Sequence, residues 1–216
     1  MLQNPKSGMP IDPSPPNEED LVKRLLARDG EAFVWAVRTY QGKMLSLARA
    51  IVGEPFAEEV VQDAWLAVIR GLPNFEGRAR LETWILRILS NTAKTRLKRE
   101  IRHRHAHITW EENPPFPERE RFGARGHWSS PPLPWHEETP EALLTSEELQ
   151  HCLTKAVAAL PPAQRAVLTL RDSEGLEMEE ICNILEISAT NGRVLLHRAR
   201  ARLRTVVENY EKGKGC

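Results

Sequence analysis

The sequence predicts an all-α protein in which two small helical domains are joined by a proline-rich, acidic linker. Apolar residues recur at helical spacing in two blocks, residues 19–103 and 160–206, and no convincing strand-like alternation occurs. Prolines gather in two polar stretches, and residues 109–140 alone hold seven of them. The expected organisation is a disordered tail over 1–17, a first domain over 18–107, a flexible linker over 108–141, a second domain over 142–208 and a tail over 209–216.

The first block is expected to form four helices, over residues 19–28, 32–52, 57–70 and 81 to about 103. Its last helix and the preceding turn are strongly basic, because residues 78–104 contain nine lysines or arginines and two glutamates. The chain as a whole is neutral, so its charges are segregated along the sequence. A basic run of this density favours binding to a polyanion.

The second block carries clear signals for the start and end of helices. Pro161 and Pro162 suit the first turn of a helix expected over 164–172, which Gly175 ends. Another helix is expected over 177–185, and Ser188 is a good N-cap for the helix that follows the next short turn. Two helices joined by a short turn, the second of them basic, are typical of a helix-turn-helix DNA-binding unit.

The last helix is expected to pack with one face and to bind DNA with another. Leu196, Ala199, Leu203 and Val206 form its apolar stripe. A neighbouring face repeats basic residues at helical spacing, namely Arg193, His197, Arg200 and Arg204. Five arginines and no acid between residues 193 and 204 favour a polyanion-binding face. The alternative interpretation is a soluble helix pair that never contacts DNA.

Other sequence features limit the compartment and the chemistry. Three widely spaced cysteines, Cys152, Cys182 and Cys216, suggest reduced thiols in a cytoplasmic protein. No apolar run approaches the roughly 18 to 20 residues that span a bilayer. The sequence contains no phosphate-binding glycine loop, nucleophile elbow or zinc-protease helix, so neither an enzyme nor a cofactor is expected.

Two long patterns carry a resemblance to a known family. The first block contains AEEVVQDAW over residues 57–65, GLPNF over 71–75 and RLETWI over 80–85. The second contains LPP over 160–162, LRD over 170–172, IS over 187–188 and HRAR over 197–200. In this order and separation they resemble the second and fourth domains of extracytoplasmic-function (ECF) sigma factors, the small two-domain group of the sigma-70 family.

This resemblance implies that the helix over 57–70 binds the largest catalytic subunit of core RNA polymerase. Its apolar ridge comprises Val61, Ala64, Trp65, Val68 and Ile69. The residues expected to contact polymerase are Glu58, Glu59, Gln62, Asp63 and Trp65. Trp65 is a plausible anchor for such a contact. The alternative is that the ridge residues are core residues, in which case the polar rim makes the contact.

The resemblance also implies that the basic helix of the first block captures the non-template strand of the minus-10 element, with a flipped base held by the loop over 75–80. The expected DNA-binding residues are Phe75, Arg78, Arg80, Trp84, Arg87, Asn91, Lys94, Arg96, Lys98 and Arg99. A pocket that stacks on the base offsets the cost of unstacking, so promoter melting would need no ATP. For Trp84 a core position is the competing interpretation.

In the second domain the resemblance implies recognition of the minus-35 element. The expected contacts are Arg171, Ser188, Thr190, Asn191, Arg193, His197, Arg200 and Arg204. Residues at the start of a recognition helix enter the major groove, so Asn191 and Arg193 are expected to contact base edges. Gly192 is expected to allow close approach of the backbone to the groove. Residues 191–194, Asn-Gly-Arg-Val, depart from the Thr-Val-Lys-Ser usual in the family, so no promoter sequence can be transferred.

Further expectations concern the linker and possible partners. About 32 linker residues at roughly 3.1 to 3.3 Å each reach about 100 Å, enough for elements about 25 base pairs apart. The acidic linker would thread a basic polymerase channel or act as a simple tether. The family also implies an anti-sigma factor. Alternatives are a stand-alone helix-turn-helix regulator and, through His103, His105 and His107, a metal-responsive one.

Overall fold

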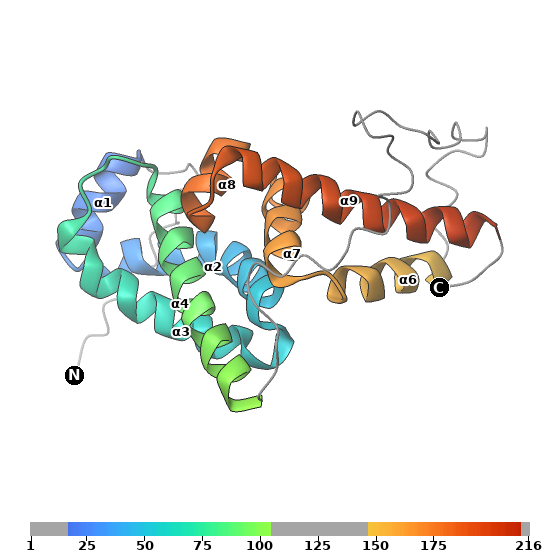
Figure 1. The fold of residues 1–216 in the computed structure, drawn as a ribbon. Helices are drawn as coiled ribbons and strands as arrows, with labels where there is room; N and C mark the ends of the chain where they lie inside the picture. Colours follow the sequence, from blue (N-terminus) through green and yellow to red (C-terminus); the bar gives the residue numbers. More distant parts are fainter. Residues whose placement is uncertain (1–16, 105–146, 213–216) are drawn as a thin grey trace, which may run out of the picture.

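The computed structural model describes residues 17–104 and 147–212, and within these ranges the secondary structure is helical with no strand (Figure 1). The first block comprises α1 (Glu18–Leu26), α2 (Gly30–Val52), α3 (Glu54–Gly71), the short 3₁₀ helix η1 (Leu72–Asn74) and α4 (Leu81–Arg104). The second comprises α6 (Glu147–Ala158), α7 (Pro162–Leu168), the π-helical turn η3 (Thr169–Ser173), α8 (Met178–Leu185) and α9 (Ala189–Glu211). The predicted all-α class is confirmed.

The first block is a bundle in which α2, α3 and α4 pack against one another. Its centre is filled by fully buried side chains such as Met44, Leu47, Leu86 and Leu89, which are the residues that drive helix association. α1 contacts the start of α4, where the carboxylate of Glu18 accepts a 2.9 Å hydrogen bond from the N–H of Leu81. The first residue of the basic helix is therefore hydrogen-bonded to α1.

The helix-turn-helix of the second block is built as the sequence predicts. Pro161 is the N-cap of α7 and Pro162 its first residue, while Gly175 adopts φ 71° after η3. The hydroxyl of Ser188 accepts a 3.2 Å hydrogen bond from the N–H of Asn191 and so caps α9. The predicted helix over 164–172 is interrupted, because from Thr169 onward the backbone widens into a π turn.

α6 is a helix that the sequence analysis did not single out. Its first turn carries Glu147 and Glu148, and acids at this end are favoured by the helix dipole. Leu149 and Cys152 are buried, and the helix packs along α9. The signal was available, since apolar residues from 149 to 160 recur at spacings of three and four.

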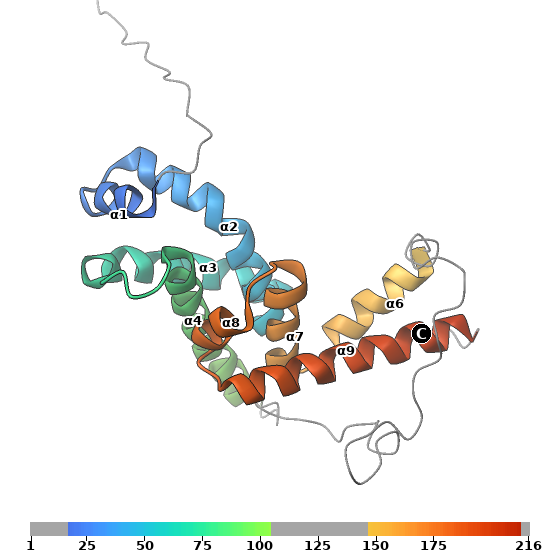
Figure 2. The ribbon, with the colours of Figure 1, turned by 90° about the horizontal axis from the view of Figure 1, so that it is seen from above.

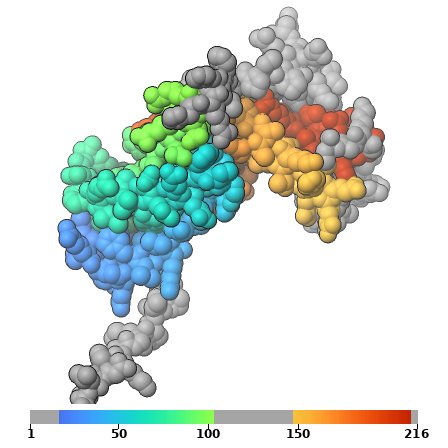
Figure 3. All heavy atoms as spheres, turned by 90° about the horizontal axis from the view of Figure 1, so that it is seen from below, coloured from blue at the N-terminus to red at the C-terminus, as the bar shows by residue number. Residues whose placement is uncertain are grey.

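The second block lies against the first in the structure. α8 packs on α4, and α7 packs on α2 (Figure 2). The space-filling view shows the two blocks as one continuous body, with α6 projecting from one end (Figure 3). Segments far apart in the sequence therefore share an interface.

The described residues bear on the predictions about the cysteines, the tails, the linker and membrane-spanning helices. Cys182 is a free thiol, and Cys216 lies outside the described residues. The predicted linker over 108–141 lies outside the described residues, as do residues 1–16 and 213–216 of the predicted tails. The expected end of the second domain at residue 208 is wrong, because α9 continues to Glu211. Among the helices that are described, none is both long and apolar enough to cross a membrane.

Candidate nucleic-acid and polymerase interfaces

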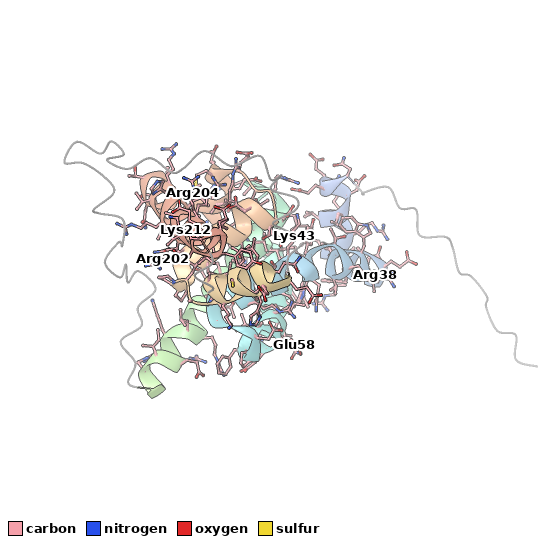
Figure 4. All side chains as sticks on the ribbon, turned by 90° about the vertical axis from the view of Figure 1, so that its right-hand side faces the viewer. Arg38, Lys43, Glu58, Arg202, Arg204 and Lys212 are labelled. Atoms are coloured by element: carbon pink, nitrogen blue, oxygen red, sulfur yellow. The ribbon has the colours of Figure 1, made fainter. Side chains whose placement is uncertain are left out.

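The polar rim predicted to bind polymerase lies on the exposed side of α3. Glu58, Gln62 and Asp63 are exposed, and Glu58 projects from α3 on the opposite side of the view from Arg204 of α9 (Figure 4). Glu59 is also exposed but forms an ion pair of 3.2 Å with Arg96 of α4. The rim therefore presents exposed carboxylates to a partner. One of them, that of Glu59, also forms an ion pair with α4.

The apolar ridge of α3 divides into core and surface residues. Val61, Ala64 and Val68 are buried, as the core interpretation of the ridge predicts. Trp65 is half-buried, and its indole donates a 3.1 Å hydrogen bond to the side chain of Gln41.

The exposed apolar surface of α3 comprises Leu66 and Ile69, which are 51% and 49% exposed. Leu66 was not predicted. The signal that could have found it is spacing, since it lies three and four residues after Asp63 and Gln62 and so continues their face. An apolar pair beside a polar rim is the usual composition of a docking surface.

The basic side chains of α4 fall into two groups. Lys98 and Arg99 are exposed near the end of the helix. Arg96 is more enclosed, because it pairs with Glu59 and with Glu100 at 3.2 Å each, and its guanidinium lies 4.6 Å from the centre of the Phe56 ring. Exposed cations reach a phosphate without breaking contacts, whereas Arg96 would have to exchange partners.

The predicted polymerase-binding and strand-binding residues meet in one cleft between α3 and α4. Its volume is about 360 Å³. It is lined by Glu59, Asp63, Asn91, Thr92, Thr95, Arg96 and Arg99. Both signs of charge and several hydrogen-bonding groups therefore face a single concave surface, where one macromolecule can contact both helices.

The loop before α4 carries two exposed arginines, and its Phe75 packs against Trp84 in the first turn of α4. Phe75 and Trp84 lie 5.1 Å apart between ring centres and pack on the core, as the core interpretation of Trp84 predicts. Arg78 pairs with Glu76 at 2.5 Å. Arg80 is exposed and lies 3.5 Å from Glu180 of α8. Arg78 and Arg80 are thus accessible to a partner, whereas Phe75 and Trp84 pack on the core.

The middle of α4 contacts the second block. Arg87 donates hydrogen bonds of 3.0 and 2.5 Å to Glu186, the residue that follows α8. Lys94 donates a 2.5 Å hydrogen bond to the carbonyl of Leu185, the last residue of α8. Burial lowers the pKa of Lys94, while the neighbouring carboxylate of Glu186 opposes that shift. Two predicted minus-10 residues are therefore occupied by protein acceptors.

The predicted basic face of α9 is confirmed as a surface. Arg193, His197, Arg200 and Arg204 are all exposed. Arg200 forms a paired contact with Asp172, with hydrogen bonds of 3.1 and 2.5 Å. Thr190, at the start of the helix, is exposed and Asn191 is half-exposed.

Two other predicted minus-35 residues have structural partners. Arg171 donates a 2.8 Å hydrogen bond to the carbonyl of Leu176 and pairs with Glu177 at 2.8 Å. These contacts hold the turn between η3 and α8. Ser188 caps α9, so its hydroxyl is already engaged when the recognition helix forms.

Gly192 has a different role from the one predicted. A Cβ at this position would lie 2.9 Å from the sulfur of Met178 and 3.2 Å from the sulfur of Cys182. Gly192 is buried and faces Met178 and Cys182 of α8. The expectation that it allows the backbone to approach a DNA groove is therefore wrong, and the glycine instead allows α8 and α9 to pack closely.

The metal-responsive alternative gains no support from the described residues. Within 17–104 and 147–212 no group of three or more histidine, cysteine or acidic side chains is arranged to hold a metal ion. His105 and His107 lie outside these ranges, and the side chain of His103 is not described.

Comparisons with known proteins identify the family. The model of sigma-70 region 2 matches residues 36–103, and that of sigma-70 region 4 matches residues 150–203. The ECF RNA polymerase sigma-E factor of Escherichia coli (strain K12) is 32% identical over 183 residues, covering 85% of this chain and 90% of the relative. The RNA polymerase sigma-H factor of Pseudomonas aeruginosa is 31% identical over 185 residues, with the same coverage.

Two solved structures share the fold. One is the sigma factor RpoE in complex with the anti-sigma factor NepR from Bartonella quintana, with a TM-score of 0.54, 18% identity and coverage of 82% of this chain and 96% of that one. The other is CnrH in complex with the cytosolic domain of CnrY, with a TM-score of 0.55, 18% identity and coverage of 88% and 97%. The stand-alone regulator is set aside in favour of the family that both domains match. The chain belongs to the ECF sigma factors of the sigma-70 family.

Proposed function

We propose that this sigma factor acts in the cytoplasm by binding core RNA polymerase through α3 and by carrying two DNA-binding surfaces to a promoter. The basic face of α9 contacts the minus-35 duplex, and α4 with its preceding loop contacts the minus-10 strand. The observation that carries the proposal is the separation of charge by helix: α3 exposes Glu58 and Asp63, whereas α9 exposes Arg193 and Arg204. A polymerase contact and a DNA contact thus use different surfaces.

Promoter melting in this proposal uses binding energy alone. Flipping a base out of a duplex costs a few kcal/mol, and contacts to the strand offset that cost. Lys98 and Arg99 are exposed and supply phosphate contacts, while Arg78 at the loop tip supplies another. No nucleotide hydrolysis is required when strand capture follows spontaneous opening.

An anti-sigma factor is also part of the proposal. Of the solved structures with this fold, one is a complex with an anti-sigma factor and another is a complex with the cytosolic domain of CnrY. In this chain the exposed apolar pair Leu66 and Ile69 beside the α3 rim offers a surface that such a partner would cover. A partner bound there would compete with polymerase for the same helix.

Reversal of the rim charges tests the polymerase contact. We expect Glu58→Lys with Asp63→Lys to weaken binding to core polymerase about fivefold or more in a fluorescence titration, because rim charges steer association. The matched control, Glu19→Lys with Asp20→Lys on α1, makes the same charge change at exposed positions of the same block. Both proteins should retain their circular dichroism. Equal affinities for the two variants would remove α3 from the polymerase interface.

A further inference from the structure

Val194, in the second turn of α9, is an apolar residue on the face of this helix that we propose binds DNA. It is 39% exposed, and over residues 147–212 no other large apolar residue is counted as exposed. A single exposed valine is ordinary on a protein surface. Its significance therefore depends on the residues that surround it and on the ligand that they suit.

The residues around Val194 on the surface of α9 are polar or basic. Thr190 precedes it by four positions and His197 follows it by three, and residues at these spacings are neighbours on one face of a helix. Both are exposed, as is Arg193. Gly192, two positions earlier, is buried, and two positions turn a helix by about 200°. Val194 therefore points away from the packed side of α9.

The start of α9 is held in place, so the position of Val194 is set before DNA binds. Leu195 and Leu196, which follow it directly, are buried. Ser188 caps the helix by accepting a hydrogen bond from the N–H of Asn191. A valine in a helix also has one strongly preferred χ1 rotamer. Little conformational entropy is therefore lost when its methyl groups contact a ligand.

The ligand that suits an apolar side chain at this place is a methyl group. In the major groove, thymine presents a C5 methyl group beside its O4 acceptor, whereas the other three bases present hydrogen-bond donors and acceptors without a methyl group. Val194 has no polar side-chain atom, so a donor or acceptor covered by it would lose its water without gaining a partner. Contact between its methyl groups and that of a pyrimidine instead removes apolar surface from water on both sides.

We propose that Val194 is a specificity-determining residue of the recognition helix, which contacts the C5 methyl group of a pyrimidine, normally thymine, in the minus-35 element. This inference rests on the proposed function of α9. It adds an apolar contact to the base-edge hydrogen bonds expected from Asn191 and the phosphate contacts expected from Arg204. Because the contact releases no counterions, its discrimination between bases should be the same at low and high salt.

Removal of the methyl group from the DNA tests this contact directly. The probe is a promoter duplex bound by the complete chain together with core polymerase. The base pairs around position minus 35 are first randomised and selected, and each selected thymine is then replaced in turn by uracil, which lacks only the methyl group. We expect one of these replacements to weaken binding about threefold for the wild type, as the loss of one buried methyl group would. The same replacement should have no effect on the binding of Val194→Ser.

The variant and its control are matched in helix propensity and exposure. Serine and valine have similar helix propensities, so Val194→Ser removes the methyl groups while α9 keeps its stability. The control, Val37→Ser, makes the same change at a valine of α2 that is 37% exposed, and it should discriminate thymine from uracil as the wild type does. Comparing the two bases within each protein removes any effect of the substitutions on polymerase binding.

A second arm separates the two bases that can carry this methyl group. Cytosine and 5-methylcytosine are compared at the same position. A gain in affinity with 5-methylcytosine for the wild type, absent for Val194→Ser, assigns the contact to the methyl group whichever base carries it. Discrimination of thymine from uracil without this gain restricts the ligand to a T·A pair, and either result supports the contact.

Three results would overturn the proposal: equal discrimination of thymine from uracil by Val194→Ser and the wild type, equal binding of the two bases by the wild type at every position, or a selected element without a T·A pair. Failure of the proposed function of α9 gives a different result. In that case no base preference at all would emerge from the randomised base pairs around position minus 35.

Discussion

Tyr40 illustrates how packing in the first block changes the chemistry of one side chain. It is 7% exposed, and its ring packs edge-on against Trp35. Burial, aided by the negative charges of Glu82 and Glu18, raises the pKa of Tyr40 to about 12. The phenol of an unfolded chain titrates near 10. The unfolded chain therefore loses this proton first, so between about pH 10 and 12 rising pH destabilises the folded protein.

The Tyr40→Phe variant tests this account of alkaline stability. Phenylalanine keeps the packing but has no proton to lose, so the free energy of unfolding should fall less steeply between about pH 10 and 12 than in the wild type. Urea unfolding at several pH values measures the difference. Parallel pH profiles for the two proteins would show that Tyr40 ionises in the folded state as readily as in the unfolded one.

Gly192 permits a second residue-level prediction with an internal control. Gly192→Ala should lower the free energy of unfolding by about 1 to 3 kcal/mol, because the added methyl overlaps Met178 and Cys182. Gly42→Ala, in the middle of α2 with no atom within 4 Å of the added Cβ, should instead stabilise by about 0.5 to 1 kcal/mol. Thermal unfolding monitored by circular dichroism compares them. A stabilised Gly192→Ala would contradict the packing that we describe.

Sequence preference at the minus-35 element should depend on the start of α9. A base-edge hydrogen bond gives about 1 to 3 kcal/mol of discrimination, so Asn191→Ala should flatten the base preference in a selection from randomised promoters. Arg204→Ala, about three and a half turns further along α9, should weaken all promoters alike and reduce the salt dependence of binding. A shifted motif with Arg204→Ala and an unchanged one with Asn191→Ala would mean that α9 docks in the opposite orientation.

At the residue scale the sequence predicted which side chains of α9 are exposed better than it predicted the side chains with which the arginines pair. The four basic residues of α9 were placed on one exposed face because helical spacing alone determines a face. The contacts of Arg200 with Asp172 and of Arg171 with Glu177 join residues whose proximity depends on the path of the π turn. Spacing carries no information about such a path.

At the scale of elements, α4 is the helix whose composition most directly suggests its function. Lys98→Ala with Arg99→Ala should reduce promoter opening, measured by permanganate reactivity of thymines, more than it reduces closed-complex binding, because strand capture follows melting. The control, Lys23→Ala with Arg38→Ala, removes two exposed cations from α1 and α2; Arg38 is visible on α2 in Figure 4. If both double variants open promoters equally, strand binding does not belong to this part of α4.

Helix boundaries were predictable where the capping residue directly precedes the apolar pattern and were missed where the capping residue lies further upstream. Ser188 and the two prolines fixed the starts of α9 and α7 within a residue or two. The expected start of the second helix at Ala32 lies two residues late, since Asp29 caps α2 through the N–H of Glu31 at 2.9 Å. A cap of this kind two residues before the apolar pattern is easily assigned to the preceding turn.

The arrangement of the whole molecule could not be read from the sequence. The expectation was two compact domains on a flexible linker, and their closure depends on side chains such as Arg87 and Glu186, which lie 99 positions apart. No periodicity or motif connects residues at that separation. Their complementarity becomes visible only in the structure, where α8 packs on α4.

Transcription in a purified system tests the central claim, that this chain gives promoter specificity to RNA polymerase. Core polymerase is incubated with fragmented genomic DNA, with and without the protein, and the 5′ ends of the transcripts are mapped. We predict start sites that depend on the protein and share one sequence element near position minus 35 and another near minus 10. Start sites that are the same with and without the protein, or that share neither element, would contradict the account.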